Sequence, residues 1–309
     1  MRLHLDTDFG GDPDDACALA MLLGWPDVEI VGITTNLDAG GRRAGCVCHF
    51  LELAGRDDIP VAAGAGVSLT TLQRYESTWG DSRYWPEPVT PRPAAPGAAI
   101  DLLARNLGRG ATVVAIGAFT NLALLEVSRP GSLAGVAVVA TAGWLGRLPP
   151  GFPDWGPEMD FNVQCDTRAA SIVAGLADLT LVTLPATVKA HLRSTDLPRL
   201  RAAGPMGQLL ARQSEANAID AHMAELGRSC SALPDDLVNF HWDPVTCAVA
   251  AGWSGATLEE LRLAPELDGE VVRFRESPQG RPTRAVVDID ADDFRDRWLR
   301  SIEAADSRH

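Results

Sequence analysis

Short apolar segments alternate with helical ones along most of this chain. Six runs rich in Val, Ile, Leu, Ala and Thr have the length of strands, and apolar residues recur at helical spacing between them. Strands that alternate with helices predict an α/β fold, in which helices cover both faces of a mostly parallel, twisted sheet. The predicted strands are residues 2–5, 28–34, 60–63, 112–116, 135–141 and 179–184, and the predicted helices are 14–23, 42–53, 98–107, 122–126 and 167–174.

Four segments depart from this alternation. Residues 70–96 and 145–157 are rich in Pro, Gly and aromatic residues, which is typical of long binding loops or of irregular surface packing. Residues 205–228 are predicted to be a helical excursion. Residues 270–290 alternate about a Ser-Pro-Gln-Gly turn and predict a β-hairpin, which a last helix over 292–304 follows. Without a repeat or a long linker, we expect a single domain over residues 1–309.

Charge and composition narrow the class of protein. The chain has 309 residues, 46% of them hydrophobic, and a net charge of −14. A chain this acidic is a poor partner for nucleic acid or an anionic membrane, and no apolar run approaches the ~20 residues of a membrane span. Six cysteines without a CxxC pair indicate reduced thiols. We therefore expect a cytoplasmic enzyme.

The first predicted strand leads into an unusually acidic turn. Five aspartates follow one another there, namely Asp6, Asp8, Asp12, Asp14 and Asp15. Carboxylates packed this closely repel one another, and Ca²⁺ and Mg²⁺ prefer oxygen ligands, so the turn predicts a site for a hard cation. A solvated loop with one aspartate as a helix N-cap would explain one or two of these residues, but not five.

Polar residues follow several other predicted strands. Such residues occur within 34–38, 117–121, 154–162 and 239–244. Ligands of parallel sheets bind beyond the carboxyl ends of the strands, so we expect these segments to meet at one site. They offer carboxylates, amides and hydroxyls with little positive charge, which suits an uncharged, polyhydroxylated substrate and a divalent cation. The absence of a glycine-rich phosphate loop argues against a phosphatase or a dinucleotide cofactor.

The ordered motifs resemble those of the inosine–uridine-preferring nucleoside hydrolases over nearly the whole chain. The matching segments are Asp6-Thr7-Asp8-Phe9-Gly10 with Asp14-Asp15-Ala16, Gly32-Ile33-Thr34-Thr35, residues 55–64, residues 117–123, Asp160-Phe161-Asn162 and Asp243-Pro244. The resemblance implies a Rossmann-like nucleoside hydrolase fold and Ca²⁺-dependent hydrolysis of the N-glycosidic bond of a ribonucleoside. It also implies a homo-oligomer.

The resemblance also assigns roles to individual residues. Asp8 would be a metal ligand and the base that deprotonates the metal-bound water. Asp15 and Asp243 would be carboxylate ligands of Ca²⁺, and Thr120 would be a ligand through its backbone carbonyl. The residues that would hold the ribose hydroxyls are Asp14, Asp38, Asp160 and Asn162, with Asp154 as a further candidate.

The chain also departs from the family pattern. Two additional residues in the acidic turn make Asp12 a further candidate ligand, and Asp160 stands where the family has Glu. Trp242 occupies the position at which some members carry a histidine that protonates the leaving base, and His241 is displaced by one residue. Either His241 protonates the base, or Trp242, Trp155 or Trp79 stacks on it, so base specificity stays open.

Two other functions are compatible with these residues. The altered leaving-group side would suit ribosyl transfer, or hydrolysis of an unusual glycoside in a specialised pathway. A non-catalytic nucleoside- or sugar-binding protein would keep the same pocket without turnover. The complete set of metal-type carboxylates favours a hydrolase.

Overall fold

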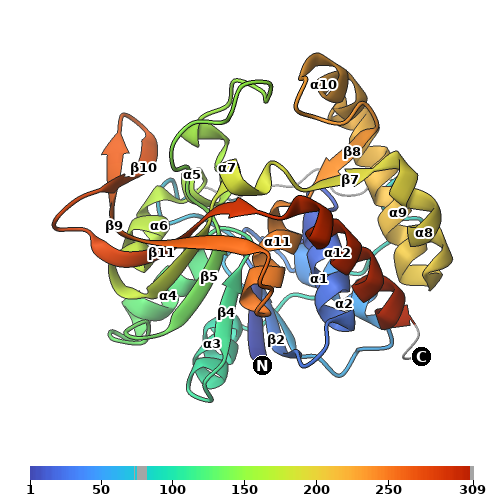
Figure 1. Cartoon of the computed structure of the whole chain (residues 1–309). Coiled ribbons are helices and arrows are strands. Elements are labelled where there is room, and N and C mark those ends of the chain that lie inside the picture. The colour runs from blue at the N-terminus through green and yellow to red at the C-terminus, as the bar shows by residue number, and fades with distance from the viewer. Residues whose placement is uncertain (73, 75–81, 307–309) are drawn as a thin grey trace.

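A twisted nine-stranded sheet forms the centre of the described chain (Figure 1). The computed structural model describes residues 1–72, 74 and 82–306. The strand order is β10-β9-β11-β6-β5-β4-β1-β2-β3. Six neighbouring strands, β1 to β6, run parallel as predicted. They are β1 (Arg2–Thr7), β2 (Glu29–Thr35), β3 (Val61–Ala63), β4 (Thr112–Ala115), β5 (Ala137–Thr141) and β6 (Asp178–Val182).

Helices cover both faces of this sheet, as the alternating pattern predicts. Along β4, Val114 belongs to the core cluster on one face, whereas its neighbours Val113 and Ala115 belong to the cluster on the other. The first face carries α1 (Asp14–Gly24), α2 (Arg42–Leu53), α11 (Trp242–Ala250) and α12 (Ala291–Asp306), and the second carries α3 (Ala98–Leu107), α4 (Thr120–Ser128) and α6 (Thr167–Leu176).

The last helix, α12, lies directly against the first one, α1. The indole N–H of Trp298 on α12 donates to the carbonyl oxygen of Cys17 on α1, at 3.2 Å. The contact is so close that a Cβ on Gly24 would lie 1.7 Å from the carbonyl oxygen of Ser301. Only glycine fits at this crossing, so the two ends of the sequence form one layer.

The C-terminal hairpin has different partners from those predicted. Strands β10 (Val271–Glu276) and β11 (Arg281–Ile289) flank the predicted turn, but they do not pair with each other. An additional strand, β9 (Ala256–Asp268), lies between them and pairs antiparallel with both. The hairpin is therefore β9–β10, and β11 joins the main sheet parallel to β6.

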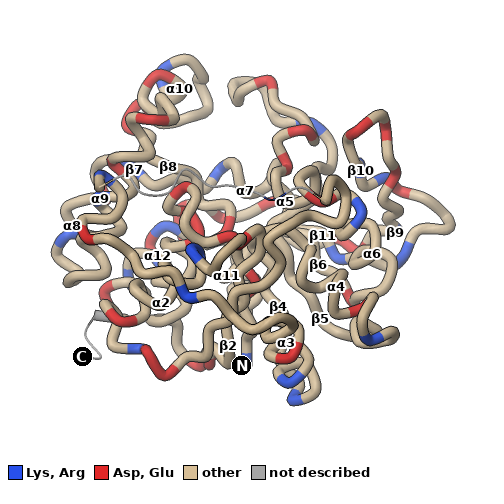
Figure 2. Tube along the Cα trace, turned by 180° about the vertical axis from the view of Figure 1, so that it is seen from behind, with Lys and Arg blue, Asp and Glu red and all other residues tan. Residues whose placement is uncertain are grey.

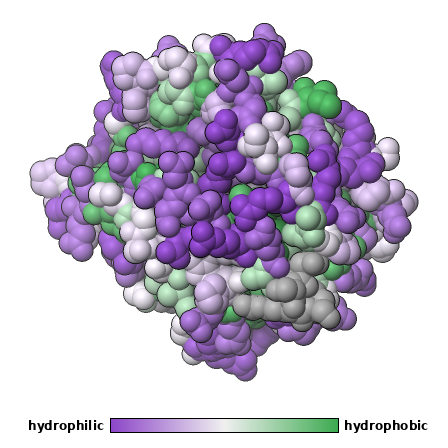
Figure 3. Space-filling view, turned by 45° about the vertical axis from the view of Figure 1, so that its right-hand side comes forward, coloured by the Kyte–Doolittle hydropathy of each residue, from purple (hydrophilic) through white to green (hydrophobic). Residues whose placement is uncertain are grey.

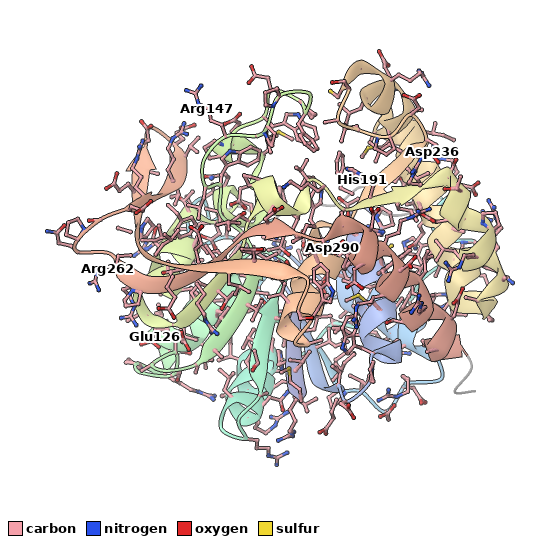
Figure 4. All side chains as sticks on the ribbon, viewed as in Figure 1. Glu126, Arg147, His191, Asp236, Arg262 and Asp290 are labelled. Atoms are coloured by element: carbon pink, nitrogen blue, oxygen red, sulfur yellow. The ribbon has the colours of Figure 1, made fainter. Side chains whose placement is uncertain are left out.

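The predicted helical excursion is two helices. They are α9 (Gly204–Asp220) and α10 (Met223–Ser229), separated at Ala221 and His222, whose φ is +53°. A short antiparallel pair, β7 (His191–Arg193) and β8 (Leu237–Phe240), connects this region to the body; Figure 4 labels His191 at the start of β7 and Asp236 just before β8. The remaining short elements are η1 (Pro157–Met159), α5 (Phe161–Gln164), α7 (Leu184–Thr187), η2 (Ser194–Asp196) and α8 (Leu197–Ala202).

The surface is mixed in character. Charged residues of both signs are spread over the outer elements (Figure 2). Hydrophobic residues form only separated patches on the face that Figure 3 shows. In the described ranges, no helix combines the length and the apolar character that crossing a membrane requires.

Candidate active site

A cavity of about 630 Å³ lies beyond the carboxyl ends of the parallel strands. The loop that follows β5 and helix α10 both project from this end of the molecule (Figure 1). Both contribute to the cavity wall, together with the acidic turn after β1 and the start of α11. Of the predicted site residues, those that line it are Asp8, Asp12, Asp14, Asp15, Trp155, Asp160, Asn162, Trp242 and Asp243.

The acidic end of the cavity joins residues that are far apart in the sequence. Asp14 and Asp15 occupy the first turn of α1, where the helix dipole favours negative charge. The backbone N–H of Asp243, in the first turn of α11, donates to Oδ2 of Asp14 at 2.9 Å. Thr7 and Thr141 orient two of these carboxylates, because their hydroxyls donate to Oδ1 of Asp15 and of Asp243, respectively.

Asp8 reaches the cavity because a glycine faces it. A Cβ on Gly117, just after β4, would lie 2.6 Å from the backbone N and 2.8 Å from Oδ1 of Asp8. Any larger residue would therefore displace this carboxylate.

These carboxylates are difficult to ionise together. Burial raises the pKa of Asp15 well above its usual range, and repulsion from Asp8 and Asp243 raises it further. Burial, followed by repulsion from Asp14, does the same to the pKa of Asp243. Burial also raises the pKa of Asp8, against the opposing charge of Arg43. A bound cation would relieve both the burial and the repulsion.

The donor set fits a hard divalent cation. It consists of oxygens from several aspartates, and Oδ1 of Asp14 is buried without a hydrogen-bond partner. Across residues 1–72, 74 and 82–306, no three His, Cys, Asp or Glu side chains already converge as a metal cluster. Asp8, Asp15 and Asp243 share one cavity wall instead, as a Ca²⁺ site at this place requires.

Asp160 and Asn162 lie beside this acidic end. Oδ2 of Asp160 accepts a 2.7 Å hydrogen bond from the N–H of Gly143, and its burial raises the pKa of the carboxyl to about 7. The Asn162 amide donates to the carbonyl oxygen of Thr141 at 3.0 Å, so its own oxygen is held in a fixed direction. Hydrogen bonds to the end of β5 thus position both side chains at the cavity.

A second part of the cavity wall is aromatic. Trp242 stacks on Phe240 with 4.8 Å between ring centroids, and Trp155 contacts both rings. Trp144, Phe161, Met223 and Leu226 also line the cavity. Phe161 is 42% exposed and Met159 is 45% exposed at the rim, which is unusual for side chains of this kind. Trp79 and Tyr75, from the predicted aromatic loop, lie outside the described residues.

Four of the predicted site residues do not line the cavity. Asp38 is buried and accepts hydrogen bonds from the N–H groups of Arg43 and Ala44 in the first turn of α2, so it acts as a helix cap. Asp154 is exposed and lines a separate groove beside the loop that follows β5. Thr120 is buried, and its hydroxyl donates to Asp166.

His241 is the fourth, and its position argues against the predicted acid role. The imidazole is fully buried, 4.3 Å from the Trp298 ring between centroids, and neither ring nitrogen has a hydrogen-bond partner. Burial lowers its pKa to about 3. Adjacent residues at the start of α11 point in different directions, so Trp242 faces the cavity and His241 faces the core.

Comparison with known proteins agrees with this geometry. The family model described as inosine-uridine preferring nucleoside hydrolase matches residues 3–296. A pyrimidine-specific ribonucleoside hydrolase, RihA of Salmonella agona, is 34% identical over 225 residues, which cover 68% of this chain and 70% of that protein. The chain belongs to the inosine–uridine-preferring nucleoside hydrolase family. It is therefore a glycosidase that hydrolyses the N-glycosidic bond of nucleosides.

Solved structures of this nucleoside hydrolase family have the same fold. A purine-preferring ribonucleoside hydrolase from Gardnerella vaginalis is 21% identical, with a TM-score of 0.82 and complete coverage of both chains. An inosine-uridine preferring nucleoside hydrolase from Bacillus anthracis is 18% identical, with a TM-score of 0.73 over 98% of this chain and 99% of that one. The names of these relatives differ in the preferred base, so membership of the nucleoside hydrolase family leaves the base undefined.

Sequence reasoning missed several residues of this nucleoside hydrolase site. Thr141 ends β5 and is one of the strand-end residues that the α/β rule marks. Arg43 and Met223 gave no such signal, because they line the cavity from the first turns of α2 and α10 rather than from a strand end.

Proposed function

We propose that this cavity hydrolyses a ribonucleoside to free base and ribose with the help of one Ca²⁺ ion. The observation that carries the proposal is that Asp8 and Asp15 share a cavity wall with Asp243, which lies more than 200 residues later in the sequence. A bound Ca²⁺ would lower the pKa of the attacking water and orient it toward the sugar. Asp8, Asp15 and Asp243 would hold it, and the carbonyl of Thr120 stays a candidate ligand.

The protein side chains then have distinct tasks. Asp8 accepts the proton of the water that attacks C1′ of the ribose, because a carboxylate suffices as a base for an acidified water. Asp14, Asp160 and Asn162 bind the ribose hydroxyls. The developing positive charge on the sugar is stabilised by the carboxylates around it, since they are fixed before the reaction starts. The base lies against Trp155 and Trp242.

Replacing Asp8 tests this assignment. Asp8→Ala removes both a ligand and the base, so kcat should fall by more than about 10³-fold. The measurement is release of free base from a panel of common ribonucleosides in the presence of Ca²⁺. Asp57→Ala, at an exposed aspartate outside the cavity, is the matched control and should retain full activity. Equal activity of the two variants would refute the assignment.

The proposal also covers the cellular location of the protein and its oligomeric state. Among the described residues all six cysteines are free, which suits the reducing cytoplasm that we propose as its location. We also propose a homo-oligomer, on the family resemblance alone, and its molar mass in light scattering would test this directly.

A further inference from the structure

The lining of the cavity offers a leaving base two kinds of surroundings. Apart from Arg43, Thr141, Asn162 and the six aspartates, the described lining side chains are apolar and none of them titrates. His241 lies in the core, and His222 is exposed and does not line the cavity. Among the described residues, no side chain of the aromatic wall can therefore give a proton to a departing base.

The cavity as a whole is strongly acidic. Six aspartates line it, and Arg43 is the one lining cation among the described residues. The Arg43 guanidinium donates to the carbonyl oxygens of Leu37 and Phe9, so it is held at the cavity's edge by backbone contacts. These six carboxyl groups outnumber the positive charges that one divalent cation and Arg43 supply together. Such a site attracts a cationic ligand.

The aromatic wall has the composition that binds cations by their flat faces. Trp155 and Trp242 are only partly buried and present indole rings to the cavity, with Phe240 packed behind them. Aromatic faces attract cations through the ring quadrupole, and tryptophan does so most strongly. The same wall also stacks well on a heteroaromatic ring.

Neutral and cationic bases need different help from the protein when they leave the ribose. A neutral base leaves as an anion unless it gains a proton, and general acid catalysis of that step is worth about 10²–10⁴-fold in rate. A base that carries a positive charge at or near the glycosidic nitrogen leaves as a neutral molecule and needs no proton. A cavity whose described lining combines many carboxyl groups with an aromatic wall that carries no titratable side chain suits the second kind.

We infer that the preferred substrates are cationic N-ribosyl heteroaromatics, such as N7-alkylated purine ribosides or N-ribosylpyridinium ions. In the reaction the C1′–N bond breaks and its electron pair returns to the ring, which departs uncharged. The water oxygen bonds to C1′, and its proton passes to Asp8 and then to solvent. The products are ribose, the neutral heterocycle and one proton. This inference rests on the proposed hydrolase function.

A matched pair of substrates tests it. The wild-type protein with Ca²⁺ is assayed at pH 6 with 7-methylguanosine and with guanosine, which differ by one methyl group and one charge. We expect kcat/KM for the cationic member to exceed that for guanosine by at least about 10²-fold, because no described side chain of the aromatic wall can protonate the departing guanine. A simple N-ribosylpyridinium serves as a second cationic substrate of different shape, and uridine as a second neutral one.

Variants of Trp242 separate charge recognition from general damage. Trp242→Leu removes the aromatic face and should reduce kcat/KM for 7-methylguanosine about 3- to 30-fold more than for guanosine. Trp242→Phe keeps a ring face and should restore most of the preference. His222→Gln should leave the preference unchanged, since His222 does not line the cavity.

The outcomes separate this inference from the proposed hydrolase function. Rapid hydrolysis of guanosine or uridine, with a preference for the cation below about 10-fold, overturns the inference and leaves the proposed hydrolase function intact. Failure to cleave any ribonucleoside, with Ca²⁺ binding shown by calorimetry, overturns both. If Trp242→Leu leaves a large preference for the cation unchanged, the aromatic wall does not cause that preference. Its proposed role in binding the cation is then overturned.

Discussion

His4 shows how single buried residues set the response of this protein to acid. It lies on β1, fully buried, and its two ring nitrogens contact the Thr34 hydroxyl at 3.0 Å and the Asn106 amide at 2.8 Å. The Asn106 amide donates to Nδ1, so the neutral ring carries its proton on Nε2 and donates it to Thr34. Burial lowers the pKa of His4 to about 3, and the neutral form is therefore the folded form.

This contact predicts a loss of stability in acid. Below pH 6.5 the unfolded chain binds a proton at His4 that the folded chain does not bind until about pH 3. The free energy of unfolding therefore falls as the pH falls through that window, by about 1.4 kcal/mol per pH unit for one group. Between pH 6.5 and 5, the wild type should lose about 2 kcal/mol more than His4→Gln.

Urea denaturation of both proteins at pH 7, 6 and 5 measures this difference. Glutamine retains a donor and an acceptor but does not titrate, so it is a fair reference. Parallel pH profiles of the two proteins would mean that His4 is not the group responsible.

The individual site residues were predictable where a strand end or a motif marked them. Asp8, Asp15 and Asp243 do share one cavity. The direction of a side chain was not predictable, because it depends on how the helix that carries it is turned. Trp242 and His241 are neighbours in sequence, yet one faces the cavity and the other the core.

At the scale of elements, Asp38 controls the start of α2. Its carboxylate accepts hydrogen bonds of 3.0 Å from the N–H groups of Arg43 and Ala44 and one of 2.7 Å from the Thr35 hydroxyl. These N–H groups have no partner within the helix, so a side chain must satisfy them. The carboxylate therefore ties the end of β2 to the start of α2.

Asp38→Ala should accordingly lower stability rather than catalysis. Loss of a helix cap costs about 1–2 kcal/mol, and Asp38→Asn, which keeps one acceptor, should cost less. Thermal unfolding and kcat/KM for the best ribonucleoside are measured on the same preparations. A fall in kcat/KM of more than about 10-fold at unchanged stability would instead return Asp38 to the sugar site.

The parallel strands and their helices were predictable because each apolar run is short and each helix is periodic. The bounds of α2 and α3 agree with the prediction to the residue. Strand β9 was not predicted, because Leu258 and Leu261 are spaced as in a helix and charged residues separate them. It forms a strand because β11 and β10 offer it partners on both edges, and such tertiary pairing overrides local preference.

For the whole molecule, a bound cation would link two segments that are distant in sequence. Asp8 follows β1 and Asp15 belongs to the first turn of α1, whereas Asp243 belongs to α11. A ligand that binds only the folded state adds stability in proportion to the logarithm of its concentration, about 2.7 kcal/mol at 100 times its Kd. Ca²⁺ should therefore raise the Tm relative to the protein in EDTA.

Asp243→Asn should abolish most of this Ca²⁺-dependent rise in Tm, whereas Asp57→Ala should preserve it. Differential scanning calorimetry over a series of Ca²⁺ concentrations gives the comparison. A Tm that is the same in Ca²⁺ and in EDTA for the wild type would contradict the proposed ion site.

The α/β architecture could be predicted from the sequence, but the order of the strands in the sheet could not. Alternating strands and helices specify a parallel sheet with two covered faces, but not which strands are neighbours. The order observed here places β1 in the interior of the sheet, between β4 and β2. That arrangement brings the acidic turn beside the ends of β4 and β5, where the polar loops converge.

The packing of α12 on α1 also has a consequence for when the enzyme can become active during its synthesis. Residues 14–24 leave the ribosome early, but the side of that helix which meets Trp298 and Ser301 stays uncovered until residues 291–306 have been translated. A nascent chain that ends before residue 291 contains every aspartate of the cavity but lacks the contact between α12 and α1. Turnover should consequently begin only after residues 291–306 have emerged, and a chain truncated before residue 291 should be inactive even with Ca²⁺ present.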